Sequence, residues 1–253
     1  MAHVIAIANQ KGGVGKSTTS EALAEGLNRK GWKTLIIDLD PQGSLSLAAG
    51  VAHGVPTSYD VLTRLVDVAD AIQYREGRAD IIPADSNLAR LDVEMITTGK
   101  EYRLKEQIKP LLSDYSYIIL DTPPALGVLT VNALTAANSL IVPVQADVFS
   151  LQGLGQLNET ISVIQEYTNP NLVLSGVLLT RHNGRSILSR DMTDAARAAA
   201  EKIGTYLCKA AIREGVAIKE AQANQLPIYD YAPRSNVAAD YMEFVEEFIN
   251  RGL

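Results

Sequence analysis

The sequence predicts an α/β protein whose doubly wound, mostly parallel sheet is flanked by helices. Short apolar runs with β-branched residues recur along the chain, and segments of helical length and periodicity separate most of them. The runs are apolar throughout, which is typical of parallel strands covered on both faces. The chain has 253 residues, of which 47% are hydrophobic and 21% charged, so one large core is sufficient. We therefore predict a single domain over residues 1–253.

The N-terminal elements form the first β-α-β unit. His3–Ala8 is a short apolar run, and after a glycine-rich turn the segment Lys16–Lys30 has apolar residues at helical spacing. Gly31 marks the end of this helix, and TLIID at 34–38 predicts a second buried strand. A turn at DPQG follows, so the unit is complete by Asp38.

The remaining elements continue the alternation of strand and helix. Between 45 and 98 helix is more frequent than strand, which predicts a helical excursion at one edge of the sheet. The last helix, about Val237–Arg251, has an apolar stripe with acidic residues elsewhere, so we expect it to pack on the body. Further apolar runs predict strands at Asp80–Pro83, Tyr117–Asp121, Ser139–Val144, Leu172–Leu179 and Tyr206–Ile212.

Cysteine use and hydropathy bear on the cellular compartment. Cys208 is the only cysteine, which excludes a disulfide or a Cys-rich zinc site within one chain and favours a reducing cytoplasm. No apolar run reaches membrane-spanning length, and the start MAHVIAIANQ lacks the regions of a signal peptide. We therefore expect a cytoplasmic protein that does not associate with membranes.

Charge is unevenly distributed along the chain. The formal net charge is -6, which argues against a uniformly basic surface. Residues 175–220 nevertheless hold eight Lys and Arg against five Asp and Glu, so this segment is +3 and the remainder is -9. A local basic surface for nucleic acid is therefore compatible with an acidic protein.

The stretch NQKGGVGKST lies between the first strand and the first helix. Its glycines Gly12, Gly13 and Gly15 permit a tight turn whose N–H groups can face phosphate oxygens, at the positive end of the helix. In such a loop Lys16 would contact the β- and γ-phosphates, and Ser17 would ligate Mg²⁺. The strand, loop and helix together predict a P-loop nucleotide site.

Carboxylates at two other strand ends complete this site. Asp121 directly follows an apolar strand in YIILDTPP, as required of the carboxylate that holds Mg²⁺ through water in a P-loop ATPase. In IIDLDPQG, Asp38 ends the second strand and Asp40 lies two residues beyond. Because ligands bind at the carboxyl ends of strands in open α/β sheets, all three carboxylates can face the phosphates.

The motifs NQKGGVGKST, DLDPQG and ILDTPP together resemble the ParA family of chromosome and plasmid partition ATPases. This family lies within the deviant-Walker class, which also holds the MinD cell-division ATPases and nitrogenase iron proteins. The likeness continues in IREGVAIKEAQ and YAPRSNVAADY, so it covers almost the whole chain. It implies a P-loop NTPase fold of the deviant-Walker type. Nearly all of the chain before Asn9 is one strand, so we expect the small Soj-like type without an N-terminal DNA-binding extension.

The resemblance also accounts for a second lysine in the loop. The usual pattern has glycine at position 10, where this chain has Gln10, as ParA members commonly do. Lys11 follows and resembles the signature lysine, which reaches across a dimer interface to phosphates bound in the partner subunit. A homodimer in the ATP-bound state is therefore implied.

The family's site residues carry over to matching positions, with ATP and Mg²⁺ as cofactors. Ser17 would ligate the metal directly, and Asp38 and Asp121 would hold it through its waters. Asp40 would polarise the attacking water, so the implied catalytic residues are Lys11, Lys16 and Asp40. The resemblance points to base contacts in TRHN at 180–183 and at Ile212 and Arg213, although relatives often carry proline where this chain has Arg213. The implied nucleotide-binding residues are Lys11, Gly12, Gly13, Val14, Gly15, Lys16, Ser17, Thr18 and Arg213.

Family members of this type bind DNA without sequence preference when dimeric and ATP-bound, through basic residues in the C-terminal half. The basic 175–220 segment lies there, and Lys and Arg contacts to phosphates supply such binding. By position and charge, the candidate DNA contacts are Arg185, Arg190 and Lys219. The resemblance also implies nucleoid association and a ParB-type centromere-binding partner that stimulates hydrolysis.

Other functions compete with this one. A MinD-like ATPase that positions a complex at membranes needs a basic amphipathic tail, whereas EFVEEFINRGL is acidic. Another ParA-like ATPase that positions a protein complex stays open beside it. An iron–sulfur reductase of the nitrogenase type needs two cysteines per subunit, and this chain has one. A metabolic P-loop enzyme that acts on a small molecule stays open, although the C-terminal likeness argues against it.

Overall fold

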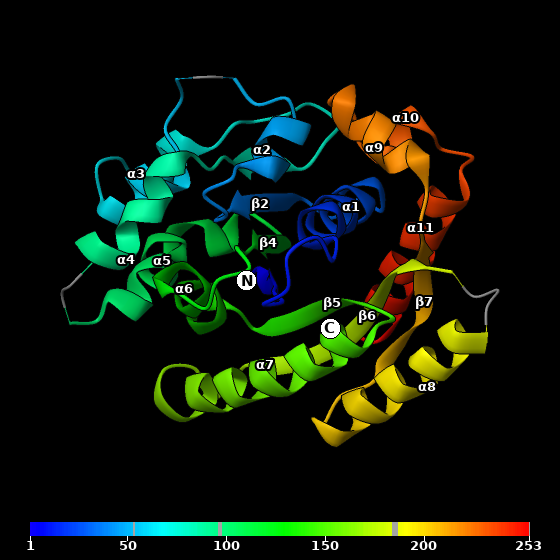
Figure 1. Ribbon diagram of the computed structural model, residues 1–253. Helices are drawn as coiled ribbons and strands as arrows, with labels where there is room; N and C mark the ends of the chain where they lie inside the picture. The colour runs from blue at the N-terminus through cyan, green and yellow to red at the C-terminus, as the bar shows by residue number, and fades with distance from the viewer. Residues whose placement is uncertain (53, 96–97, 184–186, 253) are drawn as a thin grey trace.

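The computed structural model describes residues 1–52, 54–95, 98–183 and 187–252. The described residues form a seven-stranded sheet in the order β3-β2-β4-β1-β5-β6-β7, and every neighbouring pair of strands is parallel (Figure 1). The predicted α/β fold class is therefore confirmed. The strands are β1 His3–Ile7, β2 Thr34–Asp38, β3 Asp80–Ile82, β4 Tyr117–Asp121, β5 Ser139–Gln145, β6 Val173–His182 and β7 Leu207–Arg213.

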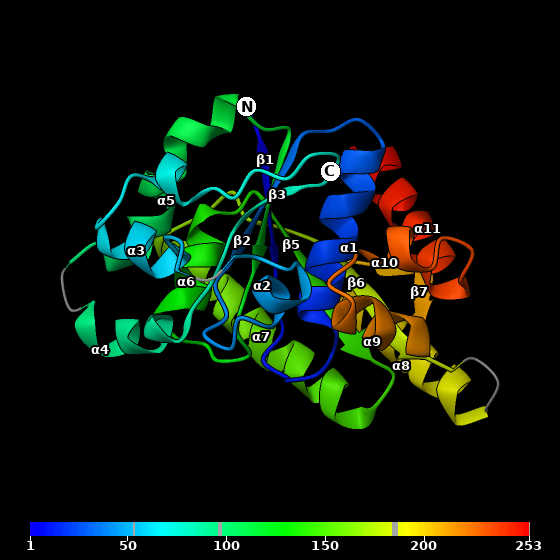
Figure 2. The ribbon, with the colours of Figure 1, turned by 90° about the horizontal axis from the view of Figure 1, so that it is seen from above.

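Helices cover both faces of the sheet (Figure 2). The longer ones are α1 Lys16–Arg29, α6 Val128–Ala136, α7 Val148–Tyr167, α8 Ile187–Lys202, α9 Val216–Ala223 and α11 Asn236–Asn250. The shorter ones are α2 Ser44–Ala48, α3 Ser58–Thr63, α4 Leu91–Glu94, α5 Arg103–Gln107 and α10 Ile228–Tyr231. Single 3₁₀ turns occupy Val68–Ala71, Ser86–Arg90, Lys100–Tyr102 and Lys109–Ser113.

Strand residues alternate between two cores. In β1, Val4 and Ala6 belong to the core beneath α3 to α8, whereas Ile5 and Ile7 belong to the core beneath α1, α2 and α9 to α11. Because successive side chains point to opposite faces, a strand buried on both sides must be apolar at every position. This explains the continuous apolar runs of the sequence.

Strands β5, β6 and β7 extend beyond their predicted ends, β5 and β7 by one residue each and β6 by three. β6 runs to His182 rather than ending near Leu179, so most of the TRHN segment is strand. The extension of β6 is paired on both sides, since Thr180 lies opposite Gln145 of β5 and His182 lies opposite Arg213 of β7.

The described part of segment 45–98 contains α2, α3, α4, two 3₁₀ turns and the edge strand β3.

Strand order places the candidate site at the middle of the sheet. β1 lies between β4 and β5, and the loop that leaves its carboxyl end leads into α1. The chain turns to one side of β1 for β2 to β4 and to the other side for β5 to β7. Such a switch point opens a crevice at the strand ends, where ligands of α/β proteins bind.

Candidate functional site

The loop between β1 and α1 has the backbone of a phosphate-binding turn. Gly13 and Gly15 have φ values of 74° and 85°, a left-handed conformation that glycine adopts without strain. A Cβ atom at Gly12 or Gly13 would meet nothing within 4 Å, so the space over these residues is open. Gly15 precedes α1 and provides no side-chain cap, so the first N–H groups of the helix are available to an anion.

Residues from β5 and β6 hold the loop in place. Asn9 is buried, donates to the Pro143 carbonyl at 2.7 Å and accepts from the Lys11 N–H at 2.9 Å. Gln145 donates to the Gly13 carbonyl at 3.1 Å, and Thr180 donates to the Val14 carbonyl at 2.7 Å. Sequence reasoning missed Asn9 and Gln145, and it placed Thr180 at the base rather than as a support of the loop, because the partners of all three lie more than one hundred positions away.

Lys16 lies inside the site. Its side chain is only 6% exposed, and its Nζ donates to the Lys11 carbonyl at 3.1 Å. Burial lowers the pKa of this ammonium group, while the carboxylates of Asp121 and Asp40 raise it. The three charges are therefore close enough to interact strongly, as they must be if they share one phosphate and metal site.

Lys11 points elsewhere. Its Nζ forms an ion pair of 2.7 Å with Asp147, just beyond β5, and the two side chains are 33% and 34% exposed. The backbone of Lys11 stays attached to the loop through Asn9. The two lysines of the loop thus have different environments, one buried beside carboxylates and one ion-paired near the surface.

Asp38 and Asp121 end neighbouring strands in register. They are directly paired positions of β2 and β4, and both are fully buried. Burial raises the pKa of each carboxyl group, and for Asp121 the charge of Asp38 raises it further. Hydrogen bonds from Ser17 and Ser20 to Asp121 oppose this effect, and the Ser20 hydroxyl lies 2.8 Å from Oδ1. Two negative charges at these buried positions would repel each other, and a bound cation would offset this repulsion.

Asp38 also organises the loop that carries Asp40. Its Oδ1 accepts from the Asp40 N–H at 3.0 Å, and its Oδ2 accepts from the Ser46 N–H and hydroxyl at 3.0 and 2.6 Å. Asp40 in turn accepts from the Gln42 N–H at 3.0 Å, an Asx turn. Asp40 is 9% exposed, so it lies at the edge of the site rather than beneath it.

These residues fit a magnesium ion bound with a nucleotide. Oδ2 of Asp121 is buried and, among the described residues, has no hydrogen-bond partner. Mg²⁺ prefers hydroxyl, carboxylate and water oxygens, and it keeps several waters when phosphates supply the remaining ligands. Ser17 and the two buried carboxylates offer this donor set, and the orphaned oxygen offers an acceptor for a metal-bound water.

A hollow of about 160 Å³ continues from the loop toward β7. Gly13, Gly15 and Thr18 line one side, and Thr180, Arg181, Ile212 and Ile218 line others. Arg213 also lines it, but its guanidinium group is bound to Asp240 of α11 at 2.5 to 3.2 Å. The structure therefore brings the expected base segments together, with the Arg213 side chain engaged by α11.

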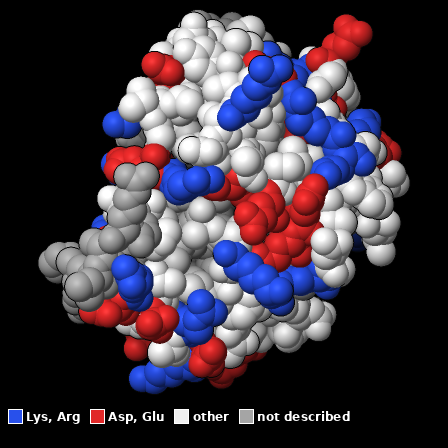
Figure 3. Space-filling model, turned by 90° about the vertical axis from the view of Figure 1, so that its right-hand side faces the viewer, with Lys and Arg blue, Asp and Glu red and all other residues white. Residues whose placement is uncertain are grey.

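The two candidate DNA contacts that the structure describes, Arg190 and Lys219, lie on different helices. Arg185 lies outside the described residues, and Arg190 is exposed on α8. Lys219 is exposed on α9 but lines the hollow beside the phosphate loop. Figure 3 shows separate groups of basic side chains on the face that carries β7 and α11, with an acidic patch near its middle.

Among the helices that the structure describes, none combines the length and the apolar character needed to cross a bilayer.

The chain is similar to known proteins over most or all of its length. A family model described as an AAA domain matches residues 2–174. The sporulation initiation inhibitor protein Soj of Bacillus subtilis is 38% identical, with all of both chains covered. The chromosome partitioning protein ParA of Caulobacter vibrioides is 38% identical over 98% of this chain and 94% of that protein.

A solved structure shares the whole fold. The crystal structure of cobyrinic acid a,c-diamide synthase from Mycobacterium smegmatis, with bound ADP and magnesium, is similar with a TM-score of 0.86 and 33% identity. The similarity covers 100% of this chain and 96% of that one. Fold, motifs and full-length relatives agree, and the chain belongs to the ParA family of P-loop ATPases.

Proposed function

We propose that this protein is a DNA partition ATPase that dimerises around ATP and Mg²⁺, binds DNA without sequence preference and releases it after hydrolysis. The observation that carries the proposal is the different placement of the two loop lysines. Lys16 is buried beside Asp40 and Asp121, whereas Lys11 is directed away toward Asp147. A second lysine that does not serve its own phosphate site has a function if it contacts phosphates in a partner subunit.

Each site residue has a separate proposed role in ATP hydrolysis. The loop N–H groups and Lys16 hold the phosphates and balance the charge that develops during transfer. Ser17, Asp38 and Asp121 would hold Mg²⁺, and the ion would supply positive charge to the phosphates. Asp40, which is fixed through Asp38, orients the attacking water. The hollow between the loop and β7 would receive the nucleoside.

The dimer is the element that switches between states. A γ-phosphate adds contacts for Lys11 of the other subunit that ADP does not make, so ATP favours the dimer and hydrolysis favours its dissociation. Two copies place twice as many basic side chains along a DNA duplex, which strengthens nonspecific binding through counterion release. A ParB-type partner would accelerate hydrolysis and time the release, and the protein would occupy the nucleoid in the cytoplasm.

A second candidate is a metabolic enzyme that acts on a small molecule. The similarity to the Mycobacterium smegmatis structure described as a cobyrinic acid a,c-diamide synthase favours it. The full-length relatives named for chromosome partitioning favour the first candidate.

Fluorescence anisotropy of a random-sequence DNA duplex tests the proposal. The duplex is titrated with protein in ATP and Mg²⁺, in ADP and Mg²⁺ and without nucleotide, at two salt concentrations. The proposal expects binding only with ATP, weakened steeply by salt. Absence of binding in every state would remove the DNA function and direct the next test to small-molecule substrates.

A further inference from the structure

Glu21 is a buried carboxylate that the proposed ATPase cycle does not use. It lies on α1 four residues after Ser17, its side chain is 7% exposed, and among the described residues its Oε1 has no hydrogen-bond partner. Buried carboxylates in proteins are normally paired or hydrogen-bonded, because removing an isolated charge from water is costly. We therefore expect a bound molecule to supply the hydrogen-bond donor that this carboxylate lacks.

The neighbouring charges do not supply that donor. Glu25 lies one turn further along α1. Its carboxylate accepts hydrogen bonds from the Arg75 guanidinium group at 3.1 Å and from the Ala79 N–H at 3.2 Å. Arg78 lies 3.7 Å from Asp230. These pairs lie on the side of α1 that faces the segment before β3, so the arginines nearest to Glu21 already have carboxylate partners.

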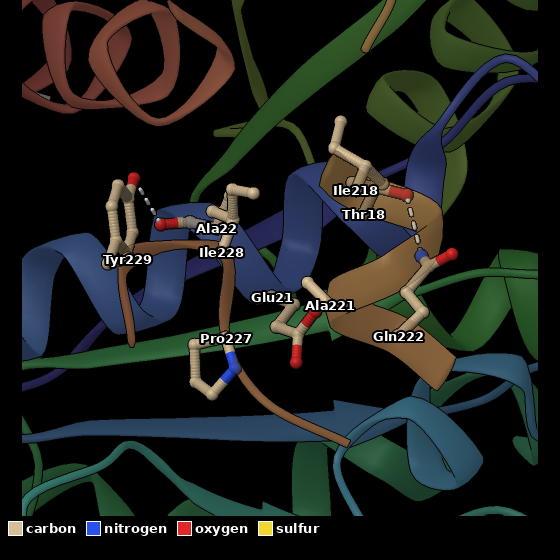
Figure 4. A pocket seen from close by; sticks show the side chains of 9 residues that line it. All are labelled: Thr18, Glu21, Ala22, Ile218, Ala221, Gln222, Pro227, Ile228 and Tyr229. Atoms are coloured by element: carbon tan, nitrogen blue, oxygen red, sulfur yellow. Dashed lines mark hydrogen bonds between the residues drawn. The ribbon is translucent and has the colours of Figure 1, made fainter. Parts of the chain in front are cut away.

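Glu21 forms part of the wall between two hollows. One is about the size of a single water molecule and is closed by α9, Pro227 and Tyr229 (Figure 4). The other is a pocket of about 300 Å³ among α1, α2 and α9. Ser17, Ser44 and Gln222 bring polar atoms to this pocket, and Leu45, Leu47 and Ala48 bring apolar surface.

The charge and polarity of the residues that line the larger pocket indicate which class of ligand it can bind. Neither Lys nor Arg is among its lining residues, so Glu21 is its charged group. A carboxylate at the wall, hydroxyl groups beside it and an apolar surface from α2 match a cationic head on an aliphatic stem. Inorganic anions and flat neutral rings do not match this combination.

We propose that this pocket binds an alkylguanidinium or alkylammonium group, with Glu21 as the counter-ion. The group is carried either by a free amine or by a Lys or Arg side chain of another polypeptide. The proposal is independent of DNA binding and partition, because it depends only on the contacts of α1, α2 and α9.

The position of the pocket connects it to the nucleotide site. α2 begins after the loop that holds Asp40, and Ser46 of α2 binds Asp38 directly. On the other side, Gln222 of α9 donates to the Thr18 hydroxyl at 3.2 Å. A ligand between α2 and α9 therefore contacts both elements that border the catalytic residues, so its binding should alter the rate of ATP turnover.

Two-dimensional NMR of the nucleotide-free, nitrogen-labelled protein tests the site. The probes are agmatine, the peptide acetyl-Gly-Arg-Gly-amide and the same peptide with citrulline, which has the shape of arginine without its charge. Agmatine or the arginine peptide should shift amide signals of α1, α2 and α9 to saturation, and the citrulline peptide should not. Saturation by agmatine indicates a free amine, and saturation by the peptide alone indicates a protein side chain.

Substitutions assign the binding to Glu21. Glu21→Gln keeps the shape of the side chain and should weaken binding at least 10-fold, since a hydrogen bond to a charged group is lost. Ala223→Arg, at an exposed position on the pocket rim, should block the probes without altering the core. Glu220→Gln, an exposed carboxylate on the same helix, should bind as the wild type does.

Other outcomes overturn the proposal. Equal affinity in the wild type and Glu21→Gln, equal affinity for the citrulline and arginine peptides, or no shifts at millimolar probe would each do so. Since nucleotide and DNA are absent from this experiment, its failure leaves the partition proposal untouched, and failure of the partition proposal leaves this site untouched.

Discussion

Replacing Asp147 with asparagine removes the carboxylate that holds Lys11 within its own chain, while the size of the side chain is kept. If Lys11 contacts phosphates of a partner subunit, its 2.7 Å ion pair with Asp147 must break when the dimer forms. The ion pair therefore opposes dimerisation. Asp147→Asn should strengthen ATP-driven dimers, which is the opposite of what loss of a structural ion pair would do.

The size of the effect follows from exposure. Both side chains are about one third exposed, and ion pairs near the surface contribute roughly 0.2 to 1 kcal/mol. A symmetric dimer breaks two such pairs, so the gain is roughly 0.4 to 2 kcal/mol, which is about 2-fold to about 30-fold in the dimer dissociation constant. Because salt screens exposed charges, the gain should shrink as ionic strength rises.

Sedimentation velocity with a slowly hydrolysed ATP analogue and Mg²⁺ measures the dissociation constant. Glu106→Gln is the matched control, because it breaks an exposed ion pair with Arg64 on elements outside the phosphate site. An Asp147→Asn protein whose dimers are unchanged or weaker, with Glu106→Gln behaving as the wild type does, would refute the inference that this ion pair competes with the dimer.

Three further predictions concern the site and its surroundings. Asp40→Ala should abolish steady-state phosphate release while ATP-driven dimers persist in sedimentation; unchanged turnover would remove Asp40 from the role proposed for it. Burial raises the pKa of Glu21 from 4.5 to about 7, so its contribution to stability is present at low pH and is lost as pH rises from about 4.5 through 7. Glu21→Gln should therefore be more stable than the wild type by up to about 3 kcal/mol at pH 8 and nearly equal at pH 4, measured by urea unfolding; the same difference at both pH values would contradict this. Asn9→Ala leaves the Pro143 carbonyl and the Lys11 N–H without their partner, which should cost about 1 to 3 kcal/mol in urea unfolding and weaken binding of a fluorescent ATP analogue; normal stability together with normal affinity would show that the loop does not depend on this anchor.

Local patterns were sufficient to predict the strands and the phosphate loop. An apolar run such as Tyr117–Asp121 is a strand buried on both faces, and its register with β2 brings Asp38 beside Asp121. Gly13 and Gly15 of the loop have the left-handed conformation that glycine adopts without strain. The strand and the loop each depend on residues close together in sequence, so a sequence pattern predicts them, whereas the pairing of Asp38 with Asp121 depends on strand order.

Contacts between distant elements could not be predicted in the same way. The ion pair between Lys11 and Asp147 requires that β5 lies next to β1, and strand order is not visible in hydrophobic periodicity. The engagement of Arg213 by Asp240 depends likewise on how α11 packs against β7. In sequence, Glu21 is one polar position within a helical pattern, and only the packing of α1 makes it a buried carboxylate.

The central place of β1 in the sheet also governs when the site can form during synthesis. β1 leaves the ribosome before the strands it pairs with, β4 and β5, so it has neither neighbour until residues 117–145 have followed it. The loop gains its Thr180 contact later still. Since pairings across such separations are slow to form and domains fold largely as units, a nascent chain lacking β5 should be unable to retain nucleotide. Ligand capture therefore cannot rescue a stalled or truncated product, and any fragment that ends before β5 should be recognised by proteases as an unfolded chain.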